Sequence, residues 1–362
     1  MVRAKKKFKM IEEIYEQPGV LKALVEQHVI GSQIAFGEFR EFRDKLSQVK
    51  RFTFWGLGSS YNAALFGNYL FEEVVGLPCE CEPADEVLSR CAIIEEGTAV
   101  VALSQSGETS DIIKAVKLAQ SNKALTIAIT NNENSTLASL ADITLLTRAG
   151  EEHAVAATKT FTSQLLIVIL LAVYLDNLKI NNGRSDIIIP ELKTLNEKVS
   201  AILAFESQIT KLAKDFKKTK QMVILGRNFS YAIALEAAQK IKETCYILSE
   251  GEPAEEFRHG PIAILDKKIP VIMLMPLDKT HDDNLQVLRE VLATNAPTYV
   301  ITTRGNREIP DEVKDIITMP PSMKILSPII SVVVFQLLAY HIALEKNIYV
   351  DSPRNIRKYI KK

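Results

Sequence analysis

Short runs of mostly apolar residues recur along the chain, and longer stretches with helical spacing of apolar positions separate them. The runs cover residues 52–55, 99–103, 125–129 and 143–146 in the first half, and 222–225, 271–275, 299–302 and 316–319 in the second. Strands as continuously apolar as these are buried on both faces, as in a parallel sheet covered by helices. The pattern therefore predicts an α/β protein with doubly wound parallel sheets.

The second half of the chain repeats the plan of the first. Residues 61–87 align without a gap to residues 231–257, so that Glu73 corresponds to Glu243. In each copy a short apolar run and a glycine turn precede the aligned stretch, and a long apolar helix closes the copy. A match over a whole supersecondary unit indicates duplication of a domain. We expect two tandem domains of the same α/β architecture, related by internal duplication.

The predicted organisation has four parts, with a polar stretch at 181–186 between the two domains. The parts are an N-terminal helical segment over 1–39, a first domain over 40–190, a second domain over 200–345 and a C-terminal tail over 346–362.

Two apolar runs raise the question of membrane insertion. The run 165–175 is too short to span a bilayer. The run 325–344 is long enough, but it contains Ser327, Pro328 and His341. We interpret both runs as helices buried in a core or a subunit interface, and we expect no membrane partner. The N-terminus also lacks the apolar core of a signal peptide, so a cytoplasmic protein is predicted.

The charge balance excludes some partners. The chain has 44 Lys and Arg residues and 44 Asp and Glu residues, so no long-range basic field is available to attract nucleic acid. The four cysteines are Cys79, Cys81, Cys91 and Cys245. Their spacing does not complete a metal-ligand set, so we expect buried thiols in a reducing compartment and no metal.

Hydroxyl-rich loops follow two of the predicted strands. Residues 104–109 read Ser-Gln-Ser-Gly-Glu-Thr between an apolar run and a helical pattern, and Gly56–Asn62 has the same arrangement after the preceding strand. Free N–H groups at a helix start, with neutral hydroxyls and a glycine that allows close approach, suit a phosphate dianion. The alternative is a serine-rich helix cap without a ligand. Neither a dinucleotide fingerprint nor a P-loop is present.

Several motifs occur together in one order. The chain resembles the sugar isomerase (SIS) family, and within it the isomerase domains of glutamine–fructose-6-phosphate aminotransferases (glucosamine-6-phosphate synthases) and stand-alone SIS-type glucosamine-6-phosphate deaminases. The similarity covers nearly the whole chain. The motifs are EIYEQP at 13–18, GSSYN at 58–62, LSQSGET at 103–109, VAATKTFTSQL at 155–165, ALEAAQKIKE at 234–243, FRHGP at 257–261 and DSPRNIRK at 351–358.

The resemblance implies roles for individual residues. The sugar phosphate is expected to bind Ser60, Ser104, Gln105, Ser106 and Thr109, and the sugar hydroxyls to contact Ser59 and the Val155 backbone. Glu243 matches the general base, Lys240 a supporting lysine, Lys358 the imine-forming lysine, and His259 a ring-opening histidine that reaches the sugar from a neighbouring subunit. Ala157 stands where the aminotransferases have serine, which removes one sugar contact.

The residues themselves support these roles unequally. Glu236, Lys240 and Glu243 share one face of a predicted helix, where a solvated salt-bridge stripe is the alternative. His259 precedes a Gly-Pro turn that suits a presented side chain, whereas the other four histidines lack such a context. Lys358 lies in a polar tail, and its role depends on the resemblance. The chemistry requires neither a metal nor an organic cofactor.

We expect an enzyme that couples aldose–ketose isomerisation to deamination, converting glucosamine 6-phosphate and water to fructose 6-phosphate and ammonia. We expect no glutaminase domain before residue 1, and this expectation favours the deamination direction. The alternatives are the isomerase module of a synthase with a separate or missing glutaminase, a fructosamine-6-phosphate deglycase, and a module that senses sugar phosphates without turnover. The resemblance also implies a homodimer.

Overall fold

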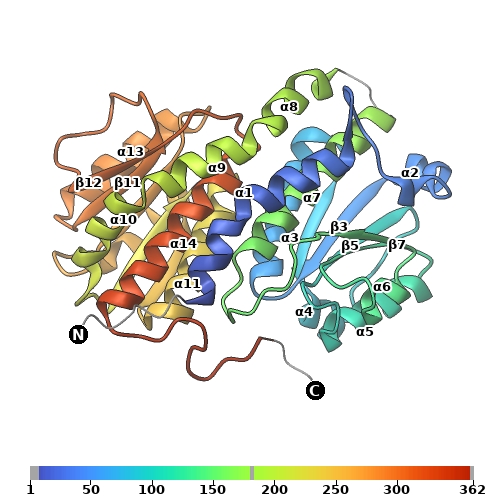
Figure 1. Cartoon of the computed structure of the whole chain (residues 1–362), viewed down its shortest axis with the longest axis horizontal. Coiled ribbons are helices and arrows are strands. Elements are labelled where there is room, and N and C mark those ends of the chain that lie inside the picture. The colour runs from blue at the N-terminus through green and yellow to red at the C-terminus, as the bar shows by residue number, and fades with distance from the viewer. Residues whose placement is uncertain (1–7, 180–182, 359–362) are drawn as a thin grey trace. The chain divides into compact units, whose positions relative to one another are not determined.

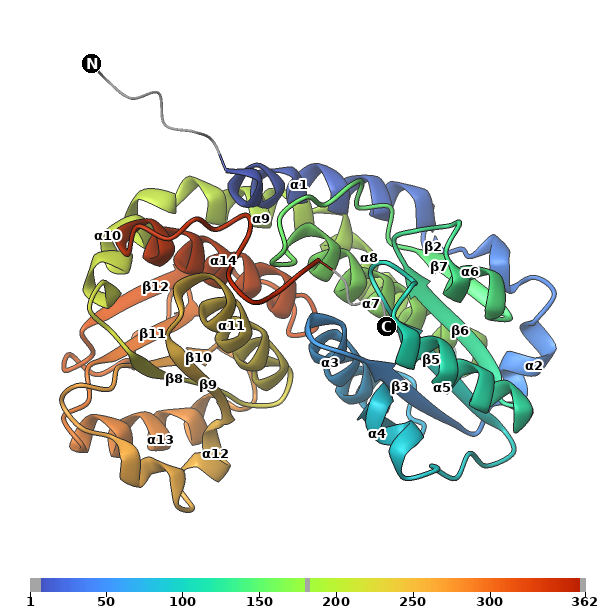
Figure 2. The same cartoon turned by 90° about the horizontal axis from the view of Figure 1, so that it is seen from below.

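The computed structural model describes residues 8–179 and 183–358 (Figures 1 and 2). The outer ends of the predicted N-terminal segment and tail, and part of the polar stretch between the domains, lie outside these residues. The described chain forms two compact units. The first-repeat unit contains Gly19–Glu151 and Lys159–Asn196, and the second-repeat unit contains residues 8–18, Glu152–Thr158 and Glu197–Lys358.

The first-repeat unit is built on a five-stranded parallel sheet in the order β4-β3-β5-β6-β7. Its main elements are β3 (Arg51–Gly56), α3 (Ser59–Val74), β4 (Cys79–Pro83), α4 (Ala84–Ser89), β5 (Thr98–Leu103), α5 (Ser110–Ser121), β6 (Leu125–Thr130), α6 (Thr136–Leu140), β7 (Ile143–Leu146), α7 (Lys159–Lys179) and α8 (Arg184–Lys193). A small hairpin of β1 (Val29–Ile30) and β2 (Gln33–Ile34), a short 3-10 helix (Gly37–Phe39) and α2 (Arg43–Gln48) precede β3.

The second-repeat unit carries an equivalent parallel sheet in the order β9-β8-β10-β11-β12. Its elements are α10 (Glu206–Ala213), β8 (Gln221–Gly226), α11 (Phe229–Cys245), β9 (Leu248–Pro253), α12 (Ala254–Phe257), β10 (Val271–Met275), α13 (His281–Ala293), β11 (Thr298–Thr303), β12 (Asp315–Met319) and α14 (Ser327–Glu345), with short 3-10 helices at Lys214–Phe216 and Pro261–Ile264. Helices α1 (Lys9–His28) and α9 (Leu195–Ala204) contribute residues to both units.

This topology confirms the predicted fold class of two tandem doubly wound α/β domains. Every predicted apolar strand is present in the sheet of its repeat. Sequence analysis missed β9 as a strand, because its residues, Leu-Ser-Glu-Gly-Glu-Pro, form no apolar run. This strand lies at the edge of its sheet, where it pairs with β8 on one side. The predicted domain boundaries stay a prediction, and the segment Glu152–Thr158 is packed with the second-repeat unit.

Both faces of the first sheet are covered, which explains the apolar runs. On β3, Phe52 and Phe54 pack edge-on against Phe71 of α3, with ring centroids 4.9 and 4.7 Å apart. The next residue, Trp55, points to the other face and joins the cluster that contains Ile112 of α5. Successive side chains on a strand point to opposite faces of the sheet. When both faces are covered by helices, both sets of side chains are buried, and the strand is apolar along its whole length.

The two long apolar helices are buried inside their own units. By length and composition α7 and α14 are apolar enough to cross a membrane, but 83% and 94% of their most apolar windows are buried. Helix α7 packs against α3, and α14 packs against α10 and α11. This burial agrees with the interpretation of both runs as core helices.

The duplication extends to the backbone of one turn. Gly58 has φ 58° and ψ −131° before α3, and Asn228, at the equivalent position before α11, has φ 56° and ψ −128°. In both turns a glycine ends the preceding strand where the helix approaches closely. A Cβ on Gly56 would lie 2.4 Å from the Ser60 carbonyl oxygen, and one on Gly226 would lie 2.2 Å from that of Ser230.

We therefore predict that Gly226→Ala lowers the free energy of unfolding by about 3 kcal/mol, because backbone atoms cannot move aside as a flexible side chain can. Gly19→Ala is the control, since a Cβ there meets nothing within 4 Å in helix α1. It should be neutral or stabilise by up to about 1 kcal/mol. Urea unfolding measures both, and equal stability of the two variants would contradict the proposed clash.

Candidate functional site

The two hydroxyl-rich loops lie side by side in the first-repeat unit. Strands β3 and β5 are neighbours in the sheet, although α3, β4 and α4 come between them in the chain. Their register pairs Trp55 with Ala102, so the loop after Gly56 and the loop after Leu103 leave the sheet at the same edge. In an open parallel sheet this change of strand order is where ligands bind.

Internal hydrogen bonds fix the shape of the loop 104–109. The Ser104 hydroxyl accepts the Gly107 N–H and the Ser106 hydroxyl accepts the Glu108 N–H, each at 3.1 Å. The Ser104 and Thr109 hydroxyls lie 3.1 Å apart. Gly107 has φ +66°, and a Cβ there would lie 2.1 Å from the Ser135 hydroxyl oxygen. Only glycine fits this turn without rearrangement.

The hydroxyls of this loop do not act as a simple helix cap. Thr109 is the N-cap of α5, yet its side chain accepts no capping hydrogen bond. Helix α3 begins at Ser59 after Gly58, which has no side chain to cap with. Neither N-cap residue therefore caps its helix through a side chain, and the first-turn N–H groups of both helices carry the partial positive charge that suits an anion. The helix-cap alternative is wrong for α5.

The remaining predicted phosphate and sugar residues of this unit differ in exposure. Ser60 is buried, and its hydroxyl accepts a hydrogen bond of 3.0 Å from the Gln164 side chain of α7. Ser59, Gln105, Ser106 and Thr109 are partly exposed. The first-repeat unit thus carries all the predicted phosphate-binding residues on its two loops.

Helix α11 of the second-repeat unit carries a buried ion network. The Lys240 ammonium lies 2.5 Å from Glu243 Oε2 and 3.6 Å from Glu236 Oε1. The side chains of Lys240 and Glu236 are 1% and 0% exposed, whereas that of Glu243 is 20% exposed. The alternative of a solvated salt-bridge stripe is therefore wrong, because two of the three groups are out of solvent.

The first repeat shows how unusual this burial is. At the positions equivalent to Glu236 and Lys240, helix α3 has Phe66 and Leu70, both fully buried. Glu73, the counterpart of Glu243, is exposed. The same scaffold is thus stable with an apolar helix face, and a buried ion pair seldom stabilises more than well-packed apolar residues do. The charges are best explained by function, and the gapless repeat alignment already contained this signal.

Electrostatics keep Lys240 charged. Burial lowers the pKa of Lys240, but the carboxylates of Glu243 and Glu236, with a smaller contribution from Glu152, outweigh burial and raise it above the ordinary value. Lys240 therefore stays an ammonium at neutral pH. An ammonium cannot act as a nucleophile, so this lysine is suited to hold and polarise Glu243.

Lys358 is brought to the segment Glu152–Thr158 within the same unit. Its Nζ donates to Glu152 Oε2 at 2.7 Å and to the carbonyl oxygen of Ala154. The Val155 N–H donates to the Asp351 carbonyl oxygen at 3.2 Å. A sugar contact from the Val155 backbone would therefore come from its carbonyl oxygen.

His259 remains apart from these groups. Its side chain is exposed, and its backbone N–H donates to the Glu256 carbonyl oxygen at 2.9 Å. Within the described residues, no hydrogen bond joins the His259 ring to another group. Gly260, at φ 145°, and Pro261 follow it and end the helical turn, as the sequence predicted. Its role across a subunit interface stays a prediction.

Two buried carboxylates of the second-repeat unit were missed. Glu152 and Glu13 are 5% and 2% exposed; Glu152 accepts a hydrogen bond from Lys358, and Glu13 accepts one from the backbone N–H of His153. Neither residue stands in a sequence pattern that indicates a function of its own, and Glu13 is the first residue of the motif EIYEQP. Their proximity could not be predicted, since Glu13 reaches this segment through a hydrogen bond to His153, which is 140 positions away in the chain.

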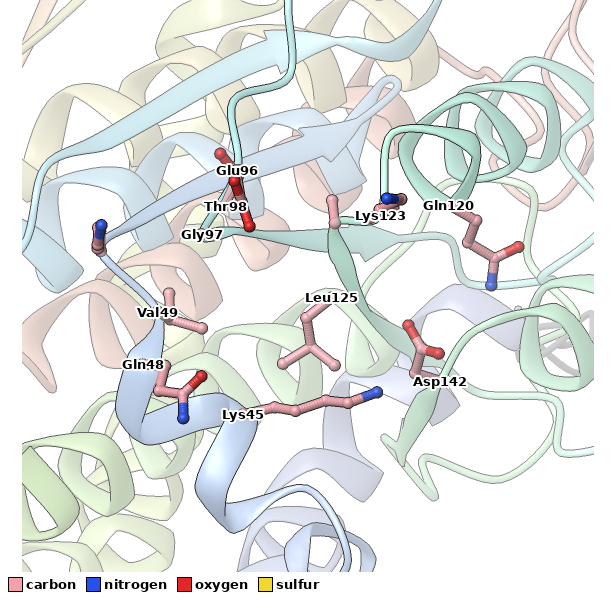
Figure 3. Close-up of a pocket in the computed structure, with 12 residues that line it drawn as sticks. Lys45, Gln48, Val49, Glu96, Gly97, Thr98, Gln120, Lys123, Leu125 and Asp142 are labelled. Atoms are coloured by element: carbon pink, nitrogen blue, oxygen red, sulfur yellow. The ribbon is translucent and has the colours of Figure 1, made fainter.

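A separate pocket lies at the other end of the first sheet (Figure 3). Its lining includes Lys50, which directly precedes β3, and Thr98 and Leu125, which begin β5 and β6. The Lys45 side chain extends across the pocket toward Asp142. Ligand sites of parallel sheets lie at the carboxyl ends. This pocket is therefore distinct from the hydroxyl-rich loops.

Comparisons with known proteins agree with this geometry. The family model described as SIS domain matches residues 45–174 and 215–346. The chain is 36% identical over 357 residues to a glutamine–fructose-6-phosphate aminotransferase (isomerizing) of Methanosarcina acetivorans, covering 97% of this chain and 57% of the relative. The corresponding Escherichia coli K12 protein is 35% identical, with 97% and 58% covered. The chain thus spans less than two thirds of these relatives.

Two solved structures are also similar. The C-terminal domain of a glucosamine-fructose-6-phosphate aminotransferase from Francisella tularensis superposes with a TM-score of 0.92 at 29% identity, covering 97% of this chain and all of that domain. A glucosamine-6-phosphate deaminase from Thermotoga maritima superposes with a TM-score of 0.72 at 25% identity, covering 97% of this chain and 99% of that protein.

The ion network yields a stability prediction. Lys240→Met should lower the free energy of unfolding by about 3–5 kcal/mol, because it leaves the buried Glu236 carboxylate without its cation. Lys242→Met on the same helix is the control, since Lys242 is exposed and should change stability by less than about 0.5 kcal/mol. Urea unfolding at neutral pH compares them, and similar midpoints would show that the network contributes little.

Proposed function

The chain belongs to the SIS domain family, and from this premise we propose that it is a phosphosugar isomerase that interconverts glucosamine 6-phosphate and fructose 6-phosphate. The observation that carries the proposal is the Glu243–Lys240 pair, a partly exposed carboxylate held by a buried ammonium where the other repeat has an apolar face. The names of the relatives support the same substrate class.

Glu243 is the proposed proton carrier. In the open-chain amino sugar it removes the proton from C2 and returns it to C1 through an enolamine, which leaves an imine at C2. Water then adds to C2 and ammonia leaves as the ketose forms. A positioned carboxylate is suited to such a transfer, and Lys240 fixes its orientation from the buried side.

The phosphate is the proposed ligand of the loop 104–109. The first-turn N–H groups of α5 and the hydroxyls of Ser104, Ser106 and Thr109 offer neutral donors to a dianion. Ser59, Ser60 and Gln105 lie on the same two loops and stay candidate ligands. His259 is the proposed ring-opening residue from a neighbouring subunit, and Lys358 is the proposed imine-forming amine.

The direction of the reaction has support on both sides. The aminotransferase names of the relatives and the high structural similarity to the Francisella domain favour the synthetic direction, with ammonia from a glutaminase. The Thermotoga deaminase favours release of ammonia from glucosamine 6-phosphate. Ammonia release from glucosamine 6-phosphate, compared with glucosamine 6-phosphate formation from fructose 6-phosphate and ammonium, measures each direction separately.

The remaining predictions from the sequence stay predictions. They are the homodimer, a separate glutaminase partner, the deglycase and sensor alternatives, and the cytoplasmic location. The four cysteines are free thiols, but the expectation that they are buried is correct only for Cys79 and Cys245, because Cys81 is partly exposed and Cys91 is exposed.

Glu243→Gln should lower turnover about 10²–10⁴-fold while sugar-phosphate binding is kept, because only the proton carrier is removed. Glu73→Gln provides a matched control at the equivalent, exposed position of the first repeat and should keep full activity. Steady-state kinetics with product identification make the measurement. If Glu243→Gln turned over at the wild-type rate, another residue would have to carry the proton.

The double change Ser104→Ala with Thr109→Ala should weaken fructose 6-phosphate binding at least about tenfold, because two donors to a charged phosphate are lost. Ser121→Ala, at the exposed far end of α5, serves as the control. Isothermal titration reports the affinity. Unchanged affinity in the double variant would place the phosphate elsewhere.

A further inference from the structure

Two buried carboxylates stand beside the proposed imine-forming lysine without a part in the chemistry above. Glu152 belongs to the segment Glu152–Thr158, and Glu13 belongs to helix α1. Both lie in the second-repeat unit with Lys358. Buried carboxylates are costly unless they are hydrogen-bonded or paired, so each contact they make bears on what they do.

Glu152 is held from two sides. Its side chain is fully buried, Oε1 accepts the Thr158 N–H at 2.8 Å, and Oε2 accepts from the Lys358 ammonium at 2.7 Å. Lys240 of α11 adds a second positive charge close enough to interact with it. Glu152 is thus the group through which the ion network of α11 and the lysine of the tail meet.

Glu13 fixes the backbone on which Glu152 stands. Its carboxylate accepts the N–H groups of His153 and Ala154, the two residues that follow Glu152. Burial, the largest effect, raises the pKa of Glu13, and the charge of Glu152 raises it further. Ala154 is also the residue whose carbonyl oxygen accepts from Lys358.

The tail is anchored so that Lys358 arrives at this segment. The Asp351 carboxylate accepts the N–H groups of Lys9 and Met10 at the start of α1, both at 2.9 Å. Further along, the Arg354 N–H donates to the Tyr246 hydroxyl at 2.9 Å. Lys358, whose side chain is 21% exposed, is therefore held by contacts along the tail as well as by its own.

We propose that Glu152 is a catalytic residue that takes the proton of Lys358 when the lysine attacks a ketose, and that Glu13 is the positioning residue of the Glu152 segment. The inference rests on the proposed function, because it needs Lys358 to form an imine. It adds two residues that the resemblance and the sequence did not assign.

The step balances without a further reactant. The Lys358 ammonium gives one proton to the Glu152 carboxylate, and the neutral amine adds to the C2 carbonyl carbon to form a carbinolamine. Glu152 returns the proton to the departing C2 hydroxyl, which leaves as water, and a protonated imine remains. The net change is ammonium plus ketone to protonated imine plus water, and Glu152 ends as it began.

The test is reductive trapping with borohydride in the presence of fructose 6-phosphate, with the adduct on Lys358 quantified by peptide mass spectrometry. Glu152→Gln keeps an acceptor for the Thr158 N–H but cannot take a proton, so trapping should slow about 10²-fold while fructose 6-phosphate affinity is unchanged. Glu151→Gln, the exposed neighbour, is the control and should trap at the wild-type rate.

Glu152→Ala opens space for a small carboxylate. Added formate should restore trapping in this variant and leave Glu152→Gln unaffected, a response that a purely structural role for Glu152 does not produce. Thermal melting identifies any variant that fails to fold. The proton-transfer role of Glu152 is then decided by the formate response of the variant that folds.

Glu13→Ala removes both acceptors of the segment and should slow trapping about tenfold. Glu13→Gln retains an acceptor oxygen and should recover most of that loss, while Glu16→Ala on the exposed side of α1 should have no effect.

The outcomes separate the two levels of the proposal. Failure of the wild-type protein to trap any adduct on Lys358 overturns the proposed function and this inference together. Wild-type trapping with an unchanged rate in Glu152→Gln, or with no response of Glu152→Ala to formate, overturns the inference alone. Loss in Glu13→Ala without recovery in Glu13→Gln overturns the positioning role.

Discussion

A buried ammonium organises the second-repeat unit. Lys240 lies between the carboxylates of Glu236 and Glu243, and it also interacts with Glu152 from another segment. In a medium of low dielectric constant, removing a single member leaves an uncompensated charge, so the groups must be present together. This requirement fixes one face of α11 and the orientation of Glu243. The cost of burying the charges explains why the equivalent helix of the first repeat, with Phe66 and Leu70, makes no such network.

Duplication allowed the two copies to diverge in chemistry while they kept one topology. Both sheets have the same strand order, and Gly58 and Asn228 keep the same backbone conformation before the following helix. The first copy places hydroxyl groups and the N-termini of two helices beyond its strands, and these neutral hydrogen-bond donors suit an anion. The second copy places charge on the helix that follows its first strand. A scaffold of continuously apolar strands tolerates both solutions, because the sheet core does not depend on the residues beyond the strand ends.

The fold was predictable because its signals are local. Apolar runs such as 99–103 can be buried strands only in a sheet covered on both faces, and the gapless repeat gave the second sheet from the first. Strand β9 had no such signal, since edge position relieves the need for apolar residues. In the candidate site, the loop 104–109 was recognisable from composition alone. The burial of Lys240 could have been read from its pairing with Leu70. The contacts of Glu13 and Glu152 could not, because they join segments that only the tertiary fold brings together.

The proposed chemistry of Lys358 depends on that non-local assembly. The lysine is a tail residue, and its environment is made by the segment Glu152–Thr158 and, through it, by α1. Backbone N–H groups donate hydrogen bonds to the buried carboxylates of Glu13 and Glu152. Fixed dipoles of this kind do not reorganise when a proton moves, which is the property that makes a preorganised site more effective than solvent. A proton can therefore pass between Lys358 and Glu152 over 2.7 Å with little rearrangement of the surrounding backbone. The burial of Glu13 and Glu152 is therefore better explained by the proposed proton transfer at Lys358 than by a contribution to stability.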